Sequence, residues 1–215
     1  MTFKILITGF EPFLEFTTNP SGKIAEYFEG RVEGNIEYHG VILPVDYSSL
    51  EAMLIESIDK INPVLVIGTG LAAGRSKMSL EKIGMNYKYS KSPDNSGKTM
   101  NGEIIDPGLP AGIFSMLDVE SLVDDLNSRG IPAEMSFTAG AYLCNNALFL
   151  ILRECRKRNI KGGFIHLPIN TEYAAKFSNK NYPSLPMSVM IEGVRHVVQN
   201  EIIRESAKSE LPGAN

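Results

Sequence analysis

Apolar and polar positions along the first part of the chain predict strands and helices in alternation. Continuous apolar runs over residues 3–9 and 63–68 are typical of strands buried in a parallel sheet. Residues 36–45 alternate as a strand does, and residues 47–61 carry apolar side chains at helical spacing after Asp46, which can cap a helix. This order predicts an α/β fold with a mostly parallel sheet and helices on both faces.

The remaining segments continue this pattern. Ser21 can cap a helix over residues 22–29, and Asp118 can cap one that ends at Ser128. Further predicted segments are strands over 103–105, 113–116, 133–138 and 162–168, helices over 147–158 and about 187–205, an irregular stretch over 171–186, and a frayed tail after about 206. The pattern contains no repeat, no low-complexity tract and no clear domain boundary.

Composition places the chain among ordinary soluble globular proteins. It has 215 residues, of which 43% are hydrophobic and 21% charged, enough for one domain or two small ones. A net charge of −4 and a pI near 5.5 argue against a surface for nucleic acid or anionic membranes. The two cysteines form no disulfide framework, the N-terminus enters a strand without a leader, and no apolar run reaches the length of a membrane span. We therefore expect a cytoplasmic protein.

Cys144 lies where a predicted strand turns into a predicted helix through small residues. The N-terminus of a helix presents unpaired N–H groups and the positive end of the helix dipole, which lower a cysteine pKa. The same amides can hold an oxyanion, so one backbone feature supplies both requirements of acyl transfer to a thiolate. The alternative is a small buried residue in a tight turn, because free cysteine is among the most buried residue types.

The chain offers few partners for a Cys–His pair. Cys155 shares an apolar helix face with its neighbours and is predicted to be a core residue. His39 lies within a strand and His196 within the terminal helix, where nothing directs either one to a site. His166 lies at the C-terminal end of the strand after the Cys144 helix, so the two side chains reach the same sheet edge. Cys144 and His166 therefore form the best dyad.

A Cys–His pair commonly has a third group that orients the imidazole. Several carboxylate or amide residues near predicted strand ends could take this role, and the sequence alone gives little basis for choosing among them. They are Glu11, Asp46, Glu81, Asp94 and Asn170. Glu81 has one supporting feature, since it interrupts an apolar alternation beside a glycine-rich loop. The alternative is that Glu81 forms part of the solvent face of an edge hairpin.

Two loops are candidate binding surfaces. Phe10, Phe13 and Phe16 stand three residues apart after the first strand, either as an apolar wall for a small uncharged ligand or as a loop folded onto the core. Residues 68–75 satisfy the G-x-G-x-x-G/A pattern of dinucleotide-binding loops. In a dinucleotide-binding loop, this motif is followed by a helix whose N-terminus binds the pyrophosphate. Residues 77–89 instead alternate as an extended chain does, so the motif is weak evidence for dinucleotide binding here.

Several stretches occur together in a specific order and spacing. They are Gly9-Phe10-Glu11-Pro12-Phe13 with Asn19-Pro20-Ser21; Gly70 to Arg75 followed by Glu81; Pro93-Asp94-Asn95 with Gly97; Ala139-Gly140-Ala141-Tyr142-Leu143-Cys144-Asn145; and Gly163-Phe164-Ile165-His166-Leu167-Pro168. Together they span nearly the whole chain and resemble pyroglutamyl peptidase type I, a family of cysteine peptidases that remove N-terminal pyroglutamate. Each stretch alone is a weak pattern, whereas their joint order is specific.

The resemblance implies a role for each matching position. Cys144 matches the nucleophile, His166 the general base and acid, and Glu81 the residue that orients the histidine. The residues implied to bind the substrate are Phe10, Phe13, Phe16, Asn19, Leu71 through its backbone, Tyr142 and Leu143. The Cys144 amide is expected to hold the oxyanion. The resemblance also implies a single three-layer α/β/α domain over residues 1–215 with a twisted mixed sheet, a homotetramer, and chemistry that needs no metal or organic cofactor.

Two positions and one segment depart from the family pattern. Leu71 stands where many relatives have glutamine, which is compatible with a contact made by the backbone. Lys91 stands where many have an arginine that is a candidate for holding the oxyanion, and lysine keeps the charge without the fork geometry. Residues 98–109 fit the family poorly. These departures bear on rate and leaving-group preference more than on fold or reaction.

Pyroglutamate suits the chemistry of these residues, because a small neutral lactam is better held by phenylalanines and a few backbone groups than by a charged clamp. A charged N-terminal amine placed against those rings would cost roughly several kcal/mol. Two alternatives remain at this stage. One is a hydrolase of another small amide that uses the same Cys144 and His166; the other is a non-catalytic nucleotide or nucleoside binder built on residues 68–75.

Overall fold

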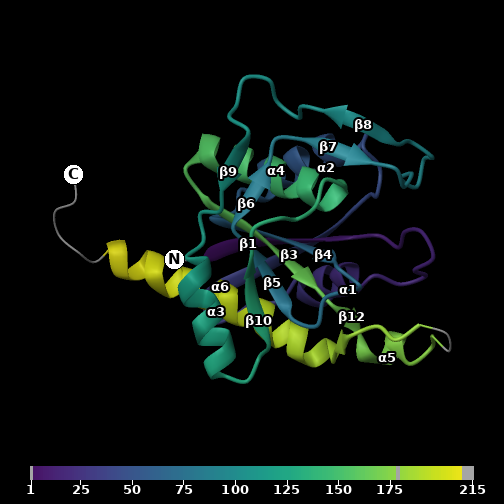
Figure 1. The fold of residues 1–215 in the computed structure, drawn as a ribbon. Coiled ribbons are helices and arrows are strands. Elements are labelled where there is room, and N and C mark those ends of the chain that lie inside the picture. The colour runs from purple at the N-terminus through teal and green to yellow at the C-terminus, as the bar shows by residue number, and fades with distance from the viewer. Residues whose placement is uncertain (1, 178–179, 210–215) are drawn as a thin grey trace.

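The protein is built around a seven-stranded sheet (Figure 1). The structure is a computed structural model that describes residues 2–177 and 180–209. The strands of this sheet are β1 (Phe3–Phe10), β2 (Val32–Glu33), β3 (Ile36–Leu43), β4 (Leu65–Leu71), β5 (Met78–Glu81), β10 (Ala133–Ser136) and β11 (Lys161–Leu167). Their order across the sheet is β10-β5-β11-β4-β1-β3-β2.

The sheet is mixed but mostly parallel. Strands β3, β1, β4 and β11 run parallel to one another. Strands β5 and β10 run parallel to each other but antiparallel to β11, and β2 runs antiparallel to β3. The predicted α/β fold with a mostly parallel, mixed sheet is therefore confirmed.

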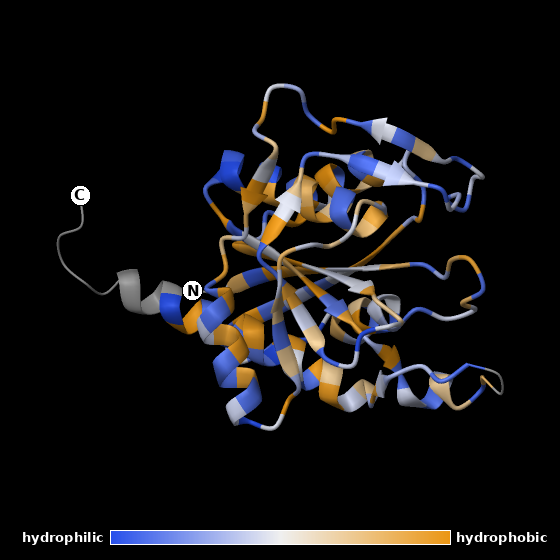
Figure 2. Cartoon of the chain, viewed as in Figure 1, coloured by the Kyte–Doolittle hydropathy of each residue, from blue (hydrophilic) through white to orange (hydrophobic). Residues whose placement is uncertain are grey.

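Helices cover both faces of this sheet. They are α1 (Pro20–Phe28), α2 (Leu50–Ile61), α3 (Val119–Ser128), α4 (Leu143–Arg158), α5 (Thr171–Ala174) and α6 (Met187–Ser209). Alternate strand residues point to opposite faces, so Ile5 and Ile7 join a core with α1, α3 and α6, whereas Leu6 joins one with α2 and α4. Figure 1 shows these two layers, and Figure 2 shows hydrophobic residues concentrated on the strands and on the helix sides facing them.

Some predicted helix boundaries move by a few residues. Asp118 caps α3 as predicted, accepting the Ser121 N–H at 3.4 Å. Helix α1, however, begins at Pro20 with Asn19 as its cap, rather than after Ser21. Helix α2 begins at Leu50, later than the predicted 47. Helix α4 begins at Leu143 rather than 147, which places Cys144 inside the first turn of the helix.

A lobe of short strands lies over α4 (Figure 1). Strand β6 (Ile83–Met85) pairs antiparallel with β9 (Gly112–Phe114), and β7 (Lys88–Ser90) pairs antiparallel with β8 (Met100–Glu103). Asn145 of α4 accepts the Met85 N–H and donates to the carbonyls of Met85 and Tyr87, each at 2.9 Å. The lobe is thus tied to the residue next to Cys144. The strands predicted over 103–105 and 113–116 form slightly earlier in the sequence, as β8 and β9.

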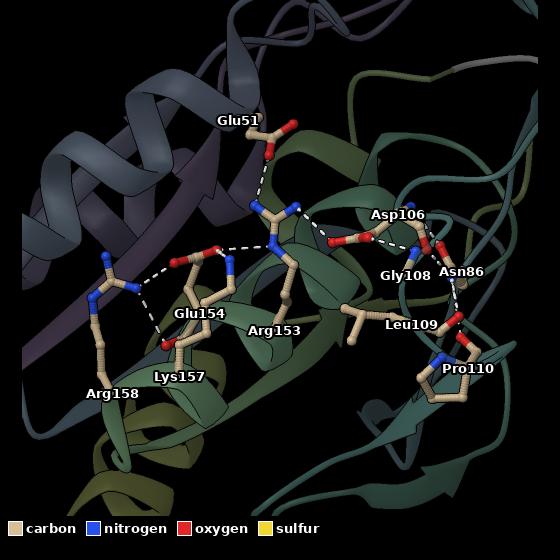
Figure 3. Close-up of polar contacts among 10 residues, drawn as sticks. All are labelled: Glu51, Asn86, Asp106, Gly108, Leu109, Pro110, Arg153, Glu154, Lys157 and Arg158. Carbon is tan, nitrogen blue, oxygen red and sulfur yellow. Dashed lines mark hydrogen bonds and ion pairs between the residues drawn. The ribbon is translucent and has the colours of Figure 1, made fainter.

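A buried arginine fixes the far end of this lobe to α4 (Figure 3). Arg153 is 8% exposed, and its guanidinium contacts Glu51 Oε1 at 2.6 Å and Asp106 Oδ2 at 3.7 Å. Asn86 donates its Nδ2 hydrogens to carbonyls within residues 106–110, at 2.7 to 3.1 Å. The loop after β8 is therefore held by an ion pair and by an amide side chain.

The C-terminal part contains more order than the pattern predicted. The stretch 171–186 includes α5 and β13 (Ser184–Leu185), which pairs in parallel with β12 (Ile169–Asn170). Helix α6 continues to Ser209, past the predicted end near 205, and the rest of the predicted frayed tail lies outside the described residues. Within the described ranges, none of the helices is both long enough and apolar enough to cross a membrane.

Candidate active site

Cys144 is the second residue of α4, directly after a turn over residues 138–142. The cap residue, Tyr142, makes no side-chain hydrogen bond to the helix. A backbone hydrogen bond of the first turn runs from the Asn146 N–H to the Tyr142 carbonyl at 3.1 Å. The Cys144 amide precedes that bond and therefore has no acceptor within the helix. An uncapped helix N-terminus with free amides suits an anion next to the thiol.

The Cys144 thiol lies against β4 at Gly70. A Cβ atom built on Gly70 would stand 2.8 Å from the Cys144 Sγ and 2.9 Å from the ring of Phe164. Strands β4 and β11 pair with Gly70 directly opposite His166. Glycine at this position therefore gives the thiol room to reach the part of the sheet where His166 lies.

His166 is held by Glu81 from the neighbouring strand β5. Its Nδ1 lies 2.7 Å from Glu81 Oε1, and the two side chains are 5% and 0% exposed. Because β5 and β11 are antiparallel with Ser79 opposite His166, Glu81 lies two residues further along and faces the same side of the sheet. An ionised carboxylate only accepts hydrogen bonds, so Nδ1 carries the proton and Nε2 keeps a free lone pair. Glu81 does not belong to a solvent-facing hairpin.

Arg75 belongs to the same cluster, a role that was not predicted from the sequence. Its Nη1 donates to Oε1 of Glu81 at 2.8 Å, and its Nη2 donates to the carbonyl of Thr138 at 3.0 Å, in the turn that leads to Cys144. The available sequence signal was its position at the end of the glycine-rich loop, as the charged residue that closes a run of small ones.

Burial and charge act together on the ionisable groups. Burial alone would raise the pKa of Glu81, but the hydrogen bond with His166, helped by Ser136 and Arg75, holds it below its usual value. Burial raises the pKa of the Cys144 thiol to about 12; the charge of Glu81 adds to the rise and that of Arg75 opposes it. Burial and Glu81 thus oppose the lowering of the pKa expected from the helix N-terminus, and a neighbouring base is needed to take the thiol proton.

A pocket opens beside the thiol. Its lining is mostly apolar and includes no charged side chain: Phe10, Phe13, Asn19, Val45, Leu71, Tyr142, Leu143 and Cys144. All of the residues predicted to bind the substrate are among these except Phe16. The Tyr142 hydroxyl donates to the Pro93 carbonyl at 2.9 Å, which fixes one wall of the pocket.

Phe16 supports the pocket from behind instead of lining it. Its ring centroid lies 5.8 Å from that of Phe13, and the side chain is 8% exposed. Three aromatic residues surround it: Tyr173, Phe177 and Tyr182. These residues come from the stretch over 171–186 that was predicted to be irregular, so this support was missed. Aromatic residues in that stretch were the available signal.

Asn19 lines the pocket, but its amide is engaged elsewhere. Its Nδ2 donates to the Glu11 carbonyl at 3.0 Å, and its Oδ1 accepts from the N–H and the hydroxyl of Ser21 at 3.0 and 2.7 Å. Asn19 therefore fixes the loop that carries the phenylalanines. Lys91 is exposed beyond the end of β7 and is not among the residues that line the pocket.

The other acidic and amide candidates hold loops rather than His166. Glu11 Oε1 accepts the Val45 N–H at 3.0 Å and the Asn95 side chain at 2.7 Å. Asp94 accepts the Tyr47 N–H at 3.0 Å. The remaining two, Asp46 and Asn170, bond to Ser48 and Glu172 near their own positions in the chain.

The remaining cysteine and histidines lie away from this cluster. Cys155 is fully buried, as predicted for a core residue. His39 pairs with Glu37, and His196 contacts Asp125 between α3 and α6. Among the described residues, no group of three or more His, Cys, Asp or Glu side chains is arranged to hold a metal ion.

Comparison with known proteins decides the family. A family model described as pyroglutamyl peptidase matches residues 3–205. The chain belongs to the pyroglutamyl peptidase family. A pyrrolidone-carboxylate peptidase from Saccharolobus islandicus is 48% identical over 207 residues, which cover 96% of this chain and 98% of that protein. One from Pyrococcus furiosus is 36% identical over 200 residues, covering 91% and 96%.

Solved structures agree with this assignment to the pyroglutamyl peptidase family. A crystal structure of pyrrolidone carboxyl peptidase from Pyrococcus furiosus, reported with its cys-free mutant, matches with a TM-score of 0.90 and 34% identity, covering 94% of this chain and 99% of that one. The glycine-rich loop also fits this family better than a dinucleotide-binding fold, because it leads into β5 and not into a helix.

Proposed function

We propose that this member of the pyroglutamyl peptidase family removes N-terminal pyroglutamate from peptides, with Cys144 as nucleophile, His166 as general base and then acid, and Glu81 orienting the imidazole. One observation carries this assignment. The Cys144 thiol lies on Gly70, opposite His166 in the sheet, and at the same time lines an uncharged pocket. Nucleophile, base and a compartment for a small neutral group thus meet at one place.

The geometry supports a definite sequence of proton transfers. Glu81 occupies Nδ1 of His166, so Nε2 takes the proton of the Cys144 thiol while the sulfur attacks the pyroglutamyl carbonyl carbon. The resulting oxyanion is stabilised by the Cys144 amide at the start of α4. His166 then gives its proton to the leaving amine, and the peptide departs. In the second half, His166 takes a proton from water as its oxygen attacks the thioester carbon; the carbon–sulfur bond then breaks, His166 returns the proton to the sulfur, and pyroglutamate is released.

The pocket supports selection of the pyroglutamyl group over an ordinary N-terminus. A neutral lactam can pack against the rings of Phe10 and Phe13 with little loss of hydration free energy. An N-terminal ammonium in the same pocket would lose its hydration without gaining a counter-charge. Leu71 lines the pocket at the end of β4, where its backbone is the candidate partner for the lactam. Rejection of charged N-termini follows from the missing partner.

The test is hydrolysis of a fluorogenic pyroglutamyl amide by the purified protein under reducing conditions, beside the matching alanyl and prolyl amides. We expect turnover of the pyroglutamyl amide alone and its loss in Cys144→Ser. Cys155→Ser is the matched control, because Cys155 is the other cysteine and is buried in the core. Turnover that persists in Cys144→Ser, or none from the folded wild type, would contradict the proposal.

We further propose a homotetramer of single-domain subunits that works in the cytoplasm, without metal or organic cofactor. Support comes from the resemblance of the sequence motifs to the family and from the absence of a disulfide framework. Light scattering after size-exclusion chromatography tests the assembly, and activity in the presence of a chelator tests the cofactor requirement. A monomer by light scattering, or activity lost to chelation, would contradict the respective part.

A further inference from the structure

Arg75 connects two parts of the site that lie far apart in the sequence. Through Nη1 it reaches Oε1 of Glu81 at 2.8 Å, the oxygen that also holds His166 Nδ1 at 2.7 Å. Through Nη2 it reaches the Thr138 carbonyl at 3.0 Å, in the turn that presents Cys144. One planar guanidinium therefore fixes the group that orients the base and the turn that carries the nucleophile.

The charge of Arg75 matters as much as its geometry. Glu81 is fully buried, and a carboxylate in that position needs compensation for its lost hydration. With Arg75 present, the positive charge offsets Glu81, so proton transfer from Cys144 to His166 takes place in a site whose charges balance. Without it, the thiolate would form close to a carboxylate whose charge is less compensated, which disfavours ionisation.

The geometry points to Arg75 as a positioning residue for the peptidase reaction: it holds Glu81 and the turn before Cys144 in register, and its charge favours formation of the thiolate. Arg75 does not line the pocket, so it acts on the reaction step rather than on substrate binding. This inference rests on the proposed function for its kinetic part only, because ionisation of Cys144 can be followed without any substrate.

Ionisable groups from several elements act on Cys144. They are Glu81 of β5, Arg75 after β4, Tyr142 before α4 and Tyr47 before α2, and His166 of β11 lies opposite Gly70, which the thiol contacts. Arg75 lowers the pKa of Cys144, in opposition to burial and to Glu81. Its removal should therefore move ionisation of the thiol to higher pH.

The experiment compares Arg75→Gln, which removes the charge, with Arg75→Lys, which keeps it without the two-armed fork. Arg204→Gln is the matched control, because Arg204 joins Asp118 at 2.7 Å and Ser121 at 2.5 Å in a similar two-armed way, on α6 at the opposite face of the sheet. Two experiments are carried out on the full chain. Steady-state kinetics gives kcat and KM for the pyroglutamyl amide, and iodoacetamide alkylation gives the reaction rate of the thiol against pH, with Cys144→Ser as background.

We expect Arg75→Gln to lower kcat about tenfold or more while KM changes little, since charged hydrogen bonds are lost outside the pocket. Its alkylation midpoint should move to higher pH. Arg75→Lys should keep the wild-type midpoint and still lose part of kcat, and Arg204→Gln should match the wild type.

Wild-type kcat in both Arg75 variants, or the same loss in both with an unchanged midpoint, would overturn the inference. If Arg75→Gln does not fold, Arg75→Lys with full kcat overturns it. If even the wild type fails to hydrolyse the pyroglutamyl amide, the proposed function fails, whereas the alkylation profiles still decide the role of Arg75.

Discussion

Replacement of Gly70 by alanine adds one methyl group at the contact between the strand and the nucleophile. Gly70 has an ordinary strand backbone, so alanine introduces no backbone strain. The added Cβ would stand 2.8 Å from Cys144 Sγ and 2.9 Å from the Phe164 ring. Carbon atoms in contact lie about 3.5–4.0 Å apart, so the thiol or the strand has to retreat by about 1 Å.

A displacement of this size should affect the reaction more than the fold. Misplacing a reacting group by about 1 Å costs about a hundredfold in rate, equivalent to about 3 kcal/mol of activation free energy. Overpacking of one methyl group costs about 1–3 kcal/mol of unfolding free energy. We therefore expect Gly70→Ala to remain folded with kcat lowered about a hundredfold.

The assay is steady-state hydrolysis of the pyroglutamyl amide, with urea unfolding in parallel. Gly74→Ala is the matched control from the loop that follows β4, because a Cβ there would meet nothing within 4 Å. It should keep wild-type kcat. A Gly70→Ala variant with wild-type kcat would show that the thiol does not lie on this strand in the working enzyme, and the spatial argument for Cys144 and His166 would be refuted.

Further predictions concern Glu81, Glu154 and Tyr47. Glu81→Gln should lower kcat about a hundredfold or more with KM little changed, because Nδ1 of His166 loses its ionised acceptor; Glu120→Gln, at an exposed pair with Lys82, should retain full kcat in the same assay. Burial alone would raise the pKa of Glu154, but Arg158, Lys157 and Arg153, which contact its carboxylate (Figure 3), lower this pKa to about 2. Ionised Glu154 therefore stabilises the fold fully above about pH 4.3, the usual pKa of glutamate. This stabilisation is lost as the pH falls toward the pKa of Glu154 in the folded protein. Urea unfolding of the wild type and Glu154→Gln should differ by up to about 3 kcal/mol near neutral pH and converge in acid, whereas a constant difference would contradict the assignment. Tyr47→Phe should leave the unfolding free energy unchanged or raise it by about 1 kcal/mol, because the buried Tyr47 hydroxyl has no hydrogen-bond partner among the described residues; a clear loss of stability would reveal a partner such as a bound water.

The sequence was most informative where local periodicity decides the outcome. The apolar runs at β1 and β4 and the helical spacing in α2 and α6 follow from which side chains must be buried, and they predicted the layered α/β fold. Helix starts were less accurate. The residues before Cys144 gave no signal for a helix beginning at Leu143, because Gly140 is a poor helix former and the lobe packed on Asn145 stabilises that first turn from a distant segment.

The site was predictable only in part, because its contacts join distant segments. The Cys144–His166 pair followed from a short list of residue types and from the sheet edge they share. The hydrogen bond from the Arg75 guanidinium to the Thr138 carbonyl joins residues 63 positions apart, and the sequence around neither residue predicts it. The aromatic support of Phe16 likewise comes from a distant segment, the one that contains Tyr173 and Phe177. The hydrogen bond from the Thr17 N–H to the Tyr173 hydroxyl joins residues 156 positions apart.

The direction of β5 explains why Glu81 could not be chosen from sequence physics alone. In a wholly parallel sheet, a residue at the C-terminal end of β5 would lie at the same edge as the end of β11. Strand β5 instead runs antiparallel to β11, so Glu81 lies beside the interior of β11, fully buried and diagonal to His166. Local alternation gives no information on strand direction, which depends on how the whole sheet packs. A carboxylate that looked like the exposed face of a hairpin is therefore the one that reaches the imidazole.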